Sequence, residues 1–410
     1  YYNQRHYYVM TEVFSKALKK TIEVDRFIGK IEGSQPGPTI IFTAGIHGNE
    51  PSGIFALHDV IKEIKEKNIP IKGNIYGISG NLTALEEQTR YIKQDLNRMW
   101  TSERMKLITS GNIEKNGEET IQQLNLYNVI NNILKTESGP FYFMDLHTTS
   151  SETTPFLTVN DSIINRKFTK QFPVPLILGI EEYLDGPLLS YINDLGYVAF
   201  GFEGGQHDSL SSIENHIAFI FQSLVYTESL AKNEIDFQHY YDTLAKTSVD
   251  TRNIYEIYYH YRIKDDEAFT MKPGFLNFQK IDKGQELANS DGEVILAKKQ
   301  GRILMPQYQE QGDDGYFSIR KIPTIFLNLS NYIRKLRVDK LLPIMPGIKW
   351  TSDKHDTLIV NRKIAWLFAK QFFHLMGYRS KKIDKTHLII KNREAVSRKD
   401  DYKGFLWAKS

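Results

Sequence analysis

The sequence predicts an α/β fold, in which a mostly parallel mixed sheet is flanked by helices and followed by a smaller C-terminal β-rich domain. The first observation is that apolar runs at residues 39–44 and 73–79 have the length and composition of strands, with a helical pattern between them. The second is that further apolar runs alternate with helical stretches as far as about residue 230, as in sheets built from right-handed crossovers. The third is a change beyond residue 270 to short strand-like runs separated by glycine and proline.

The first strand–helix–strand unit is the clearest part of the chain. Its first strand, residues 39–44, follows the turn-forming segment 33–38 and ends at Gly45. Pro51 and Ser52 then open a helix. The apolar residues of this helix recur every three or four positions, at Ile54, Leu57, Val60, Ile61 and Ile64. This spacing predicts one buried face, and the unit closes with a strand at residues 73–79.

The next elements bring polar residues to strand ends. A helix near residues 120–135 leads to a strand at 141–146, and His147 follows it directly. Further strands are expected at residues 156–159, 175–180 and 197–202, and a helix is expected at 212–230. The strand at 197–202 delivers Glu203 to its carboxyl end. Because open α/β sheets bind ligands outside the carboxyl ends of their strands, this edge is the expected site.

The second half of the chain has a different residue pattern, which suggests a division into domains. Short strand-like runs occur at residues 271–278, 284–287, 293–296 and 301–305. They predict a small barrel or sandwich. A final helix is expected at 358–376, followed by a strand at 387–391. We therefore expect a catalytic domain at 1–240, a β-rich domain closing over the site at 241–330 and a helical and strand extension at 331–410.

Composition restricts the class of protein. The 410 residues are 41% hydrophobic and 25% charged, and no segment approaches the roughly 20 consecutive apolar residues of a membrane span. Residues 1–6 lack a signal-peptide pattern, so a cytoplasmic protein without a membrane partner is expected. The net charge is +3, and the basic clusters at 379–382 and 391–399 indicate a solvated tail, not a nucleic-acid surface. Cysteine is absent, so any metal must be bound by histidine and carboxylate.

The strongest chemical motif is Gly45-Ile46-His47-Gly48-Asn49-Glu50, in which a histidine and a glutamate stand three apart on a loop that leaves a buried strand. Small residues between them allow the backbone to fold around an ion. Two histidines and one glutamate are the ligands of carboxypeptidase-type zinc sites. Taken alone, however, this short motif is common and is usually surface decoration.

His147, in Met144-Asp145-Leu146-His147, supplies a second histidine at a strand end. An isolated histidine in this position is most often a hydrogen-bonded core residue. Asp145, two residues earlier, points to the same side of the strand and could accept the second imidazole N–H, as carboxylates behind metal-bound histidines do. The combination favours a metal site.

Two further motifs carry charge. Arg90 could stabilise an oxyanion, and Asn97 with Arg98 offers an amide and a planar guanidinium suited to a carboxylate. The structural alternative for them is an exposed loop held by salt bridges. Glu203, followed by two glycines, could be a catalytic carboxylate or a residue that caps the following turn.

The ordered set of motifs resembles the succinylglutamate desuccinylase and aspartoacylase family, which is related to the zinc carboxypeptidases in fold. The motifs are His47-x-x-Glu50, Arg90-Tyr91-Ile92, Asp95-Leu96-Asn97-Arg98, Asp145-Leu146-His147 and Glu203-Gly204-Gly205-Gln206-His207. The resemblance covers about residues 35–330, including the β-rich part that closes over the site in this family. The order of the motifs outweighs the structural alternatives for each one.

This resemblance implies a mechanism. His47, Glu50 and His147 would bind one Zn²⁺ per chain, which lowers the pKa of its bound water toward about 7. Glu203 would act as general base and then general acid in the hydrolysis of an amide, and Arg90 would stabilise the oxyanion. Asn97 and Arg98 would hold the α-carboxylate of an N-acyl amino acid. A homo-oligomer remains open.

The chain departs from the family at two positions. Aspartoacylases have an arginine for the acidic side chain of N-acetylaspartate ten residues before the catalytic glutamate, where this chain has Asn193. An amide cannot balance a buried carboxylate, so selection for an aspartyl side chain is not expected. Tyr316 is the candidate for the substrate-binding tyrosine of the β-rich part.

Two alternative functions would use the same metal ligands. A zinc carboxypeptidase would act on peptides, and a noncatalytic zinc-binding protein would keep the metal without turnover. Glu203 and Arg90 favour an enzyme, because a protein that only binds zinc needs neither.

Overall fold

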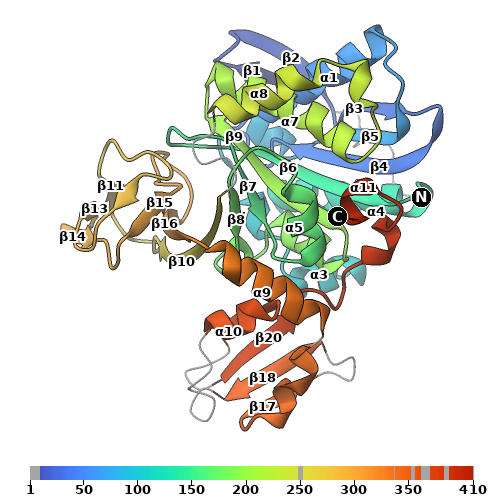
Figure 1. Cartoon of the computed structure of the whole chain (residues 1–410). Helices are drawn as coiled ribbons and strands as arrows, with labels where there is room; N and C mark the ends of the chain where they lie inside the picture. Colours follow the sequence, from blue (N-terminus) through green and yellow to red (C-terminus); the bar gives the residue numbers. More distant parts are fainter. Residues whose placement is uncertain are drawn as a thin grey trace.

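The computed structural model describes residues 10–247, 253–336, 338–351, 356–361, 370–382 and 387–409. Figure 1 shows a body built on one large sheet, with the strands that follow residue 253 beside it. Below the body lies a smaller part that contains α9 (Thr324–Lys335) and α10 (Lys370–Leu375). From there the chain returns to the body with α11 (Leu406–Lys409), close to α5 (Ile163–Thr169).

The central feature is an 11-stranded sheet, counted over the described residues. Its strands, in spatial order, are β12 (Lys280–Ile281), β15 (Gly301–Leu304), β16 (Asp314–Lys321), β10 (Ile254–Arg262), β8 (Leu176–Leu178), β7 (Phe156–Val159), β9 (Val198–Gln206), β6 (Phe141–Thr149), β4 (Gln35–Ala44), β5 (Lys72–Ser79) and β3 (Phe27–Glu32). The expected α/β architecture is confirmed as a mixed sheet flanked by helices, with an additional β-rich part.

The prediction that this sheet is mostly parallel is too strong. β5, β4, β6 and β9 run parallel along the sheet, as do β7, β8 and β10. The strands β3, β12, β15 and β16 pair antiparallel, and β7 is antiparallel to β9. Short connections such as the one between β3 and β4 permit only antiparallel or non-neighbouring strands, because a parallel crossover needs a dozen residues or more. The sheet is therefore mixed, and it is parallel where β4, β6 and β9 meet.

Helices cover both faces of the sheet. The larger helices of the body are α1 (Ser52–Glu66), α4 (Glu118–Thr136), α7 (Leu210–Tyr226) and α8 (Phe237–Thr247). The shorter ones are α2 (Leu82–Glu87), α3 (Ser102–Thr109), α5 and α6 (Leu188–Asp194). Along β4, Ile40 and Phe42 pack into the core that contains α1 and α7, whereas Ile41 packs into the core that contains α4. This alternation explains why the strand is a continuous apolar run.

The β-rich segment extends the sheet and adds a second, smaller one. β10, β16, β15 and β12 are hydrogen-bonded onto the main sheet beyond β8. A separate three-stranded sheet contains β11 (Phe269–Met271), β13 (Glu286–Ser290) and β14 (Glu293–Leu296). The expected small barrel or sandwich is seen only in part, because four of the seven strands from β10 to β16 continue the main sheet. The expected boundaries at residues 240 and 330 remain a prediction.

The predicted helix at 358–376 is wrong in its first part. Residues 357–361 form β18 (Thr357–Asn361), in which Leu358 and Val360 are buried. Residues 362–369 lie outside the described residues, and α10 covers only 370–375. β18 belongs to a four-stranded sheet with β17 (Ile348–Trp350), β20 (His387–Asn392) and β19 (Tyr378–Lys382). The strand predicted at 387–391 is confirmed as β20.

Residues after β20 are tied to the body by one buried tyrosine. The hydroxyl of Tyr402 accepts the backbone N–H of Val198 at 3.0 Å and donates to the carbonyl of Phe141. These two residues are the first of β9 and β6. Tyr402 is fully buried, so it joins the neighbouring ends of these two strands from a position far along the chain.

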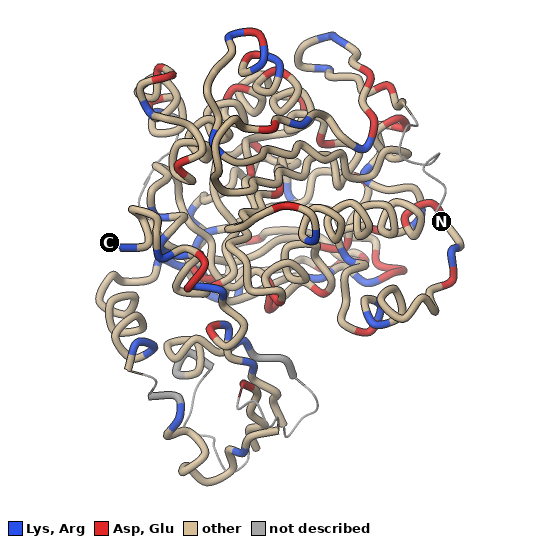
Figure 2. Tube along the Cα trace, turned by 90° about the vertical axis from the view of Figure 1, so that its right-hand side faces the viewer, with Lys and Arg blue, Asp and Glu red and all other residues tan. Residues whose placement is uncertain are grey.

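The sequence analysis did not anticipate the hairpin of β1 (Thr11–Ser15) and β2 (Lys20–Val24), nor strand β3. Figure 2 shows acidic and basic residues interspersed along the trace, with both kinds close together where the lower part meets the body. At this junction Asp161 is paired with Arg334 and Arg393 with Glu182. No helix of the described chain has the length and apolar character needed to span a bilayer.

Candidate metal centre and active site

His47 and Glu50 lie on the loop between β4 and α1. Gly45 begins this loop with a backbone φ of +67°. Residues other than glycine rarely adopt this conformation. At Gly48 a Cβ atom would lie 2.0 Å from the backbone of Ala84, so a larger residue would not fit. Both side chains are buried. The small residues of the motif therefore let the backbone turn tightly while the histidine and the glutamate point inward.

His147 and Glu203 lie on adjacent parallel strands. They are register partners on β6 and β9, which places both side chains at the carboxyl end of the sheet. His147 is inside β6 and not after it, because β6 continues to Thr149. The strand ends next to the loop that carries His47. This arrangement agrees with the prediction that these polar residues meet at one edge of the sheet.

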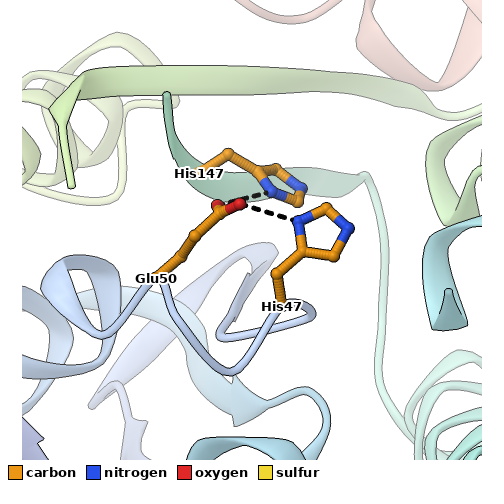
Figure 3. Close-up of side chains that lie close together, drawn as sticks. All are labelled: His47, Glu50 and His147. Atoms are coloured by element: carbon orange, nitrogen blue, oxygen red, sulfur yellow. Dashed lines mark hydrogen bonds and ion pairs between the residues drawn. The ribbon is translucent and has the colours of Figure 1, made fainter. Parts of the chain in front are cut away.

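Figure 3 shows His47, Glu50 and His147 converging on one point. Nδ1 of His47 lies 2.8 Å from Oε1 of Glu50, and Nδ1 of His147 lies 3.1 Å from Oε2. One potential ligand atom from each of the three residues lies within 4.8 Å of the others. Two imidazoles and a carboxylate, all buried and directed at one point, match the donor set that catalytic zinc sites use.

Each imidazole has a second carboxylate on its far side. Nε2 of His147 lies 2.8 Å from Oδ2 of Asp145, and Nε2 of His47 lies 3.2 Å from Oδ1 of Asp95. Asp145 is fully buried and also accepts the Thr43 hydroxyl at 2.6 Å. Carboxylates behind metal-bound histidines fix the ring orientation and leave the other nitrogen free for the ion. With a metal bound, the Nδ1 atoms would be the ring nitrogens available to the ion.

The electrostatics of the cluster also suit a cation. Burial alone would lower the pKa of His147, but the carboxylates of Asp145 and Glu50 raise it well above its ordinary value. Burial alone would raise the pKa of Glu50, but the two imidazoles hold it well below its usual range. The Thr148 N–H also donates to Glu50 Oε2 at 2.9 Å. Each imidazole lies between two carboxylates, so both of its ring nitrogens face a carboxylate oxygen. Such a ring needs either a proton on each nitrogen or a metal ion at one of them. The residues therefore fit Zn²⁺.

Glu203, the register partner of His147, has a buried carboxylate oxygen that is left without a hydrogen bond among the described residues. Its Oε2 atom has no partner, although the side chain is buried. Burial raises the pKa of Glu203 to about 8, and the negative charges of Glu50 and Asp145 act in the same direction. His147 and Arg90 oppose this shift. A carboxylate that titrates near neutral pH is suited to proton transfer.

Arg90 is close to the cluster but already paired. Its Nε and Nη2 atoms donate to Oδ2 of Asp95 at 3.3 and 3.1 Å. Its Nη1 atom lies 3.5 Å from Oε1 of Glu50. Asp95 also contacts His47. It therefore links Arg90 to this histidine of the candidate metal site.

Asn97 and Arg98 lie on the short 3₁₀ helix η2 (Leu96–Arg98), where both line the cavity. Asn97 accepts the backbone N–H of Leu188 at 2.9 Å through its side-chain oxygen. Arg98 donates to the carboxylate of Asp314, from the start of β16, and to the Asn97 carbonyl at 2.9 Å. Neither side chain is free, although the sequence analysis assigned both to the substrate.

Tyr316 does not line the cavity. It is buried between Tyr259 and Tyr261, and it stacks on Tyr261 at a ring-centroid distance of 5.6 Å. Tyr316 packs into the core of the β-rich part, whereas the next residue of β16, Phe317, lines the cavity. Asp314, two positions before Tyr316, also reaches the cavity. The substrate-binding role predicted for Tyr316 therefore has no support in this geometry.

The loop between β15 and β16 covers the site. Gln309 accepts hydrogen bonds from Asn49 and His207, both at 3.1 Å. Gln311 donates to the Tyr91 carbonyl at 3.1 Å and accepts the Tyr91 N–H at 3.3 Å. These contacts are made to loops that carry or adjoin the metal ligands. They give the β-rich segment a closing position over the cavity.

Sequence reasoning missed these cover residues. Gln309 lies 260 positions from Asn49 and Asp314 lies 216 positions from Arg98, and no local pattern distinguishes them. His207 was part of a quoted motif but received no role. Its Nδ1 atom lies 2.7 Å from the Thr148 hydroxyl, and burial lowers its pKa. A histidine directly after a strand that ends at the site was the available signal.

Asn193 lines the same cavity from the last turn of α6. Its side chain accepts from Asn165 at 2.9 Å and donates to the Leu189 carbonyl at 2.8 Å. The position that holds an arginine in aspartoacylases is thus occupied by a neutral side chain with its hydrogen bonds satisfied. The cavity has a volume of about 140 Å³.

Comparison with known proteins shows which family the region around the site resembles. Residues 36–214 match the family model described as the succinylglutamate desuccinylase/aspartoacylase catalytic domain. A succinylglutamate desuccinylase from Photorhabdus laumondii is 31% identical over 114 residues, which are 27% of this chain and 33% of that relative. One from Serratia proteamaculans is 29% identical over 109 residues, which are 27% of this chain and 31% of that relative. The matches thus span about a third of the length of these relatives.

Solved structures share the fold over a longer stretch. Succinylglutamate desuccinylase from Vibrio cholerae aligns with a TM-score of 0.54 at 17% identity, covering 78% of this chain and 92% of that one. The product-bound ectoine utilization protein EutE from Ruegeria pomeroyi aligns with a TM-score of 0.53 at 15% identity, covering 74% and 90%. The resemblance inferred from the motifs is therefore confirmed. Over residues 36–214, this chain is similar to the catalytic domain of the succinylglutamate desuccinylase/aspartoacylase family.

Proposed function

We propose that this protein is a zinc-dependent hydrolase that cleaves the amide bond of an N-acyl amino acid and releases a carboxylic acid and an amine. The observation that carries the proposal is the convergence of His47, Glu50 and His147 beside the unpartnered carboxylate of Glu203. The family match over residues 36–214 supports the same reaction type. We propose one Zn²⁺ per chain, held by these three ligands.

A zinc ion in this position would polarise the substrate carbonyl and lower the pKa of a water molecule toward neutrality. The remaining work falls to the chain. Glu203 takes a proton from the attacking water at Oε2 and returns it to the nitrogen of the departing amine. Its raised pKa of about 8 lets the carboxylate hold the proton between these two transfers.

Arg90 and Arg98 provide the positive charge of the cavity. Nη1 of Arg90, 3.5 Å from Glu50, is placed to stabilise the oxyanion that forms as water adds to the amide carbonyl. Arg98, with Asn97, orients the substrate carboxylate at the other side of the cavity. A cavity of about 140 Å³ is close in size to the engineered 150 Å³ cavity that binds benzene, so small N-acyl amino acids should be tested first.

Two measurements on one sample test the proposal. Zinc is determined by elemental analysis, and amine release is then followed from a panel of N-acetyl, N-succinyl and longer N-acyl amino acids. We expect one zinc per chain and amine release that a chelator abolishes and added zinc restores. Absence of zinc from well-folded protein would refute the metal site.

The same sample separates the competing functions. A zinc carboxypeptidase would release the C-terminal residue from a blocked dipeptide and would leave N-acetyl amino acids intact. A noncatalytic zinc-binding protein would hold the metal and release no product from either substrate. Either result would contradict the proposed deacylase while leaving the metal ligands in place.

A further inference from the structure

The cations that line the active-site cavity are already neutralised by the protein. Among the described residues that line it, Arg90 and Arg98 are the only arginines, and no lysine is present. Arg90 is paired with Asp95, and Arg98 is paired with Asp314. A substrate carboxylate that enters this cavity therefore meets no guanidinium without an existing carboxylate partner.

Asp314 occupies Arg98 from a different part of the fold. It is the first residue of β16, whereas Arg98 lies at the end of η2. The two side chains are about one-fifth exposed, so solvent only partly screens the pair. Nε2 of His260 lies 2.8 Å from the other carboxylate oxygen of Asp314. Burial alone would raise the pKa of Asp314, but Arg98 and His260 hold it well below its usual range.

Among the described residues, the remaining cavity wall holds no lysine or further arginine for a second carboxylate. Its uncharged part includes Leu184, Leu189, Phe200 and Phe317. Asn193 lies there as well, with its amide already hydrogen-bonded to Asn165 and Leu189. Glu181, which also lines the cavity, adds another negative charge, although Arg393 pairs with it at 2.9 Å.

We propose that Asp314 is a specificity-determining residue, which competes with the substrate for Arg98 and restricts the cavity to N-acyl amino acids with one carboxylate. This inference rests on the proposed deacylase function and names its substrate class. The acyl group and the amino-acid side chain are both uncharged. N-succinyl and N-acetylaspartyl compounds, which carry additional carboxylates, are disfavoured.

The reason is the charge that each bound carboxylate meets. The first substrate carboxylate must share Arg98 with Asp314 and is repelled by it. Every further carboxylate experiences the same repulsion and finds no lining arginine that lacks a carboxylate partner, because Arg90 is paired with Asp95. Removing the charge of Asp314 eliminates one repulsive interaction per substrate carboxylate, so a dicarboxylate gains more than a monocarboxylate.

The test compares N-acetylalanine with N-acetylaspartate in the zinc-loaded wild-type protein and the Asp314→Asn variant. Wild type should prefer N-acetylalanine in kcat/KM. In Asp314→Asn, the preference should shift toward N-acetylaspartate by about tenfold, which corresponds to about 1.4 kcal/mol. Asp313→Asn is the matched control. Asp313 is the preceding carboxylate, pairs at the surface with Arg262 and does not line the cavity, so the preference should shift much less than in Asp314→Asn.

Binding separates this inference from the proposed reaction. The same two compounds are titrated calorimetrically into Glu203→Gln protein with and without Asp314→Asn, so no turnover is needed. Tighter binding of the dicarboxylate on loss of Asp314 supports the inference even if wild type hydrolyses neither compound. A wild-type preference for N-acetylaspartate, or equal ratios in Asp314→Asn and its parent, would overturn it. Circular dichroism establishes that each variant is folded.

Discussion

Oδ2 of Asp145 lies 2.8 Å from Nε2 of His147, and this contact directs Nδ1 of the same ring toward Glu50. Loss of a carboxylate behind a metal-bound histidine typically weakens metal binding by about 10- to 100-fold. We expect a decrease of that size in zinc affinity for Asp145→Asn, measured by competition with a chelating dye. Asp59→Asn removes a carboxylate from an exposed histidine pair on α1 and should leave zinc affinity unchanged.

His147→Ala should remove one metal ligand. Elemental analysis after extensive dialysis should give much less than one zinc per chain, because two protein ligands hold zinc poorly. His58→Ala, on the solvent-facing side of α1, is the control and should retain wild-type stoichiometry. An unchanged zinc content in His147→Ala would exclude this residue from the ligand set.

Glu203→Gln should lower turnover without loss of metal. The amide keeps the shape of the side chain but cannot accept the proton, and proton transfer by a positioned side chain typically contributes about 10²- to 10⁴-fold. Steady-state kinetics and elemental analysis of the same preparation provide the measurement. Glu214→Gln makes the same change on an exposed position of α7 and should be fully active. Near-normal kcat in Glu203→Gln would assign the proton transfer to another group.

His216 should make folding stability depend on pH. It is fully buried against Gly204, and burial lowers its pKa to about 4. Between about pH 6.5 and 4, the unfolded chain binds a proton here that the folded chain does not bind, so stability falls as pH falls. From pH 7 to 5 the metal-free wild type should lose about 2 kcal/mol more than His216→Asn.

Urea titrations of both metal-free proteins at each pH test this difference. Metal-free protein is used because zinc binding has a pH dependence of its own. Parallel stability curves for wild type and His216→Asn would show that His216 does not contribute.

Asp161 should be essential for attachment of the lower part of the molecule. Its carboxylate pairs with Arg166 and with Arg334 at 2.8 Å, and all three groups are buried. Asp161→Ala leaves these guanidinium groups without their partner, which typically costs about 3–5 kcal/mol. Chemical denaturation should show this loss. Glu63→Ala breaks an exposed helical pair with Lys67 and should cost about 0.5 kcal/mol or less.

The sequence could predict that His47, Glu50 and His147 lie together, because each belongs to a local pattern. His47 and Glu50 leave an apolar strand through small residues, and Asp145 and His147 share one side of another strand. Parallel strands bring their carboxyl ends to one edge, so these local patterns imply a shared location. The contacts among these residues in the structure follow from that rule.

The cover of the site could not be predicted in this way. Asp314 meets Arg98, and Gln309 meets Asn49, through folding of segments that are separated by more than 200 residues. No periodicity encodes such a pairing. The helix predicted at 358–376 failed for a related reason. The apolar run that begins at Leu358 is compatible with either a helix or a strand, and pairing of β18 with β20 determines the outcome.

The hydroxyl of Tyr402 has a consequence for the order of folding. It satisfies the first N–H of β9 and the first carbonyl of β6, which precede it by 204 and 261 residues. Contacts over such separations form late, because a long loop must close before they contribute. The strands β6 and β9, which carry His147 and Glu203, can pair earlier. Their first residues gain the hydrogen bonds to Tyr402 only when the segment that follows the lower part has docked. A proteolytic cut between residues 340 and 400 would therefore weaken the attachment of Tyr402 to the first residues of β6 and β9, which lie opposite the site.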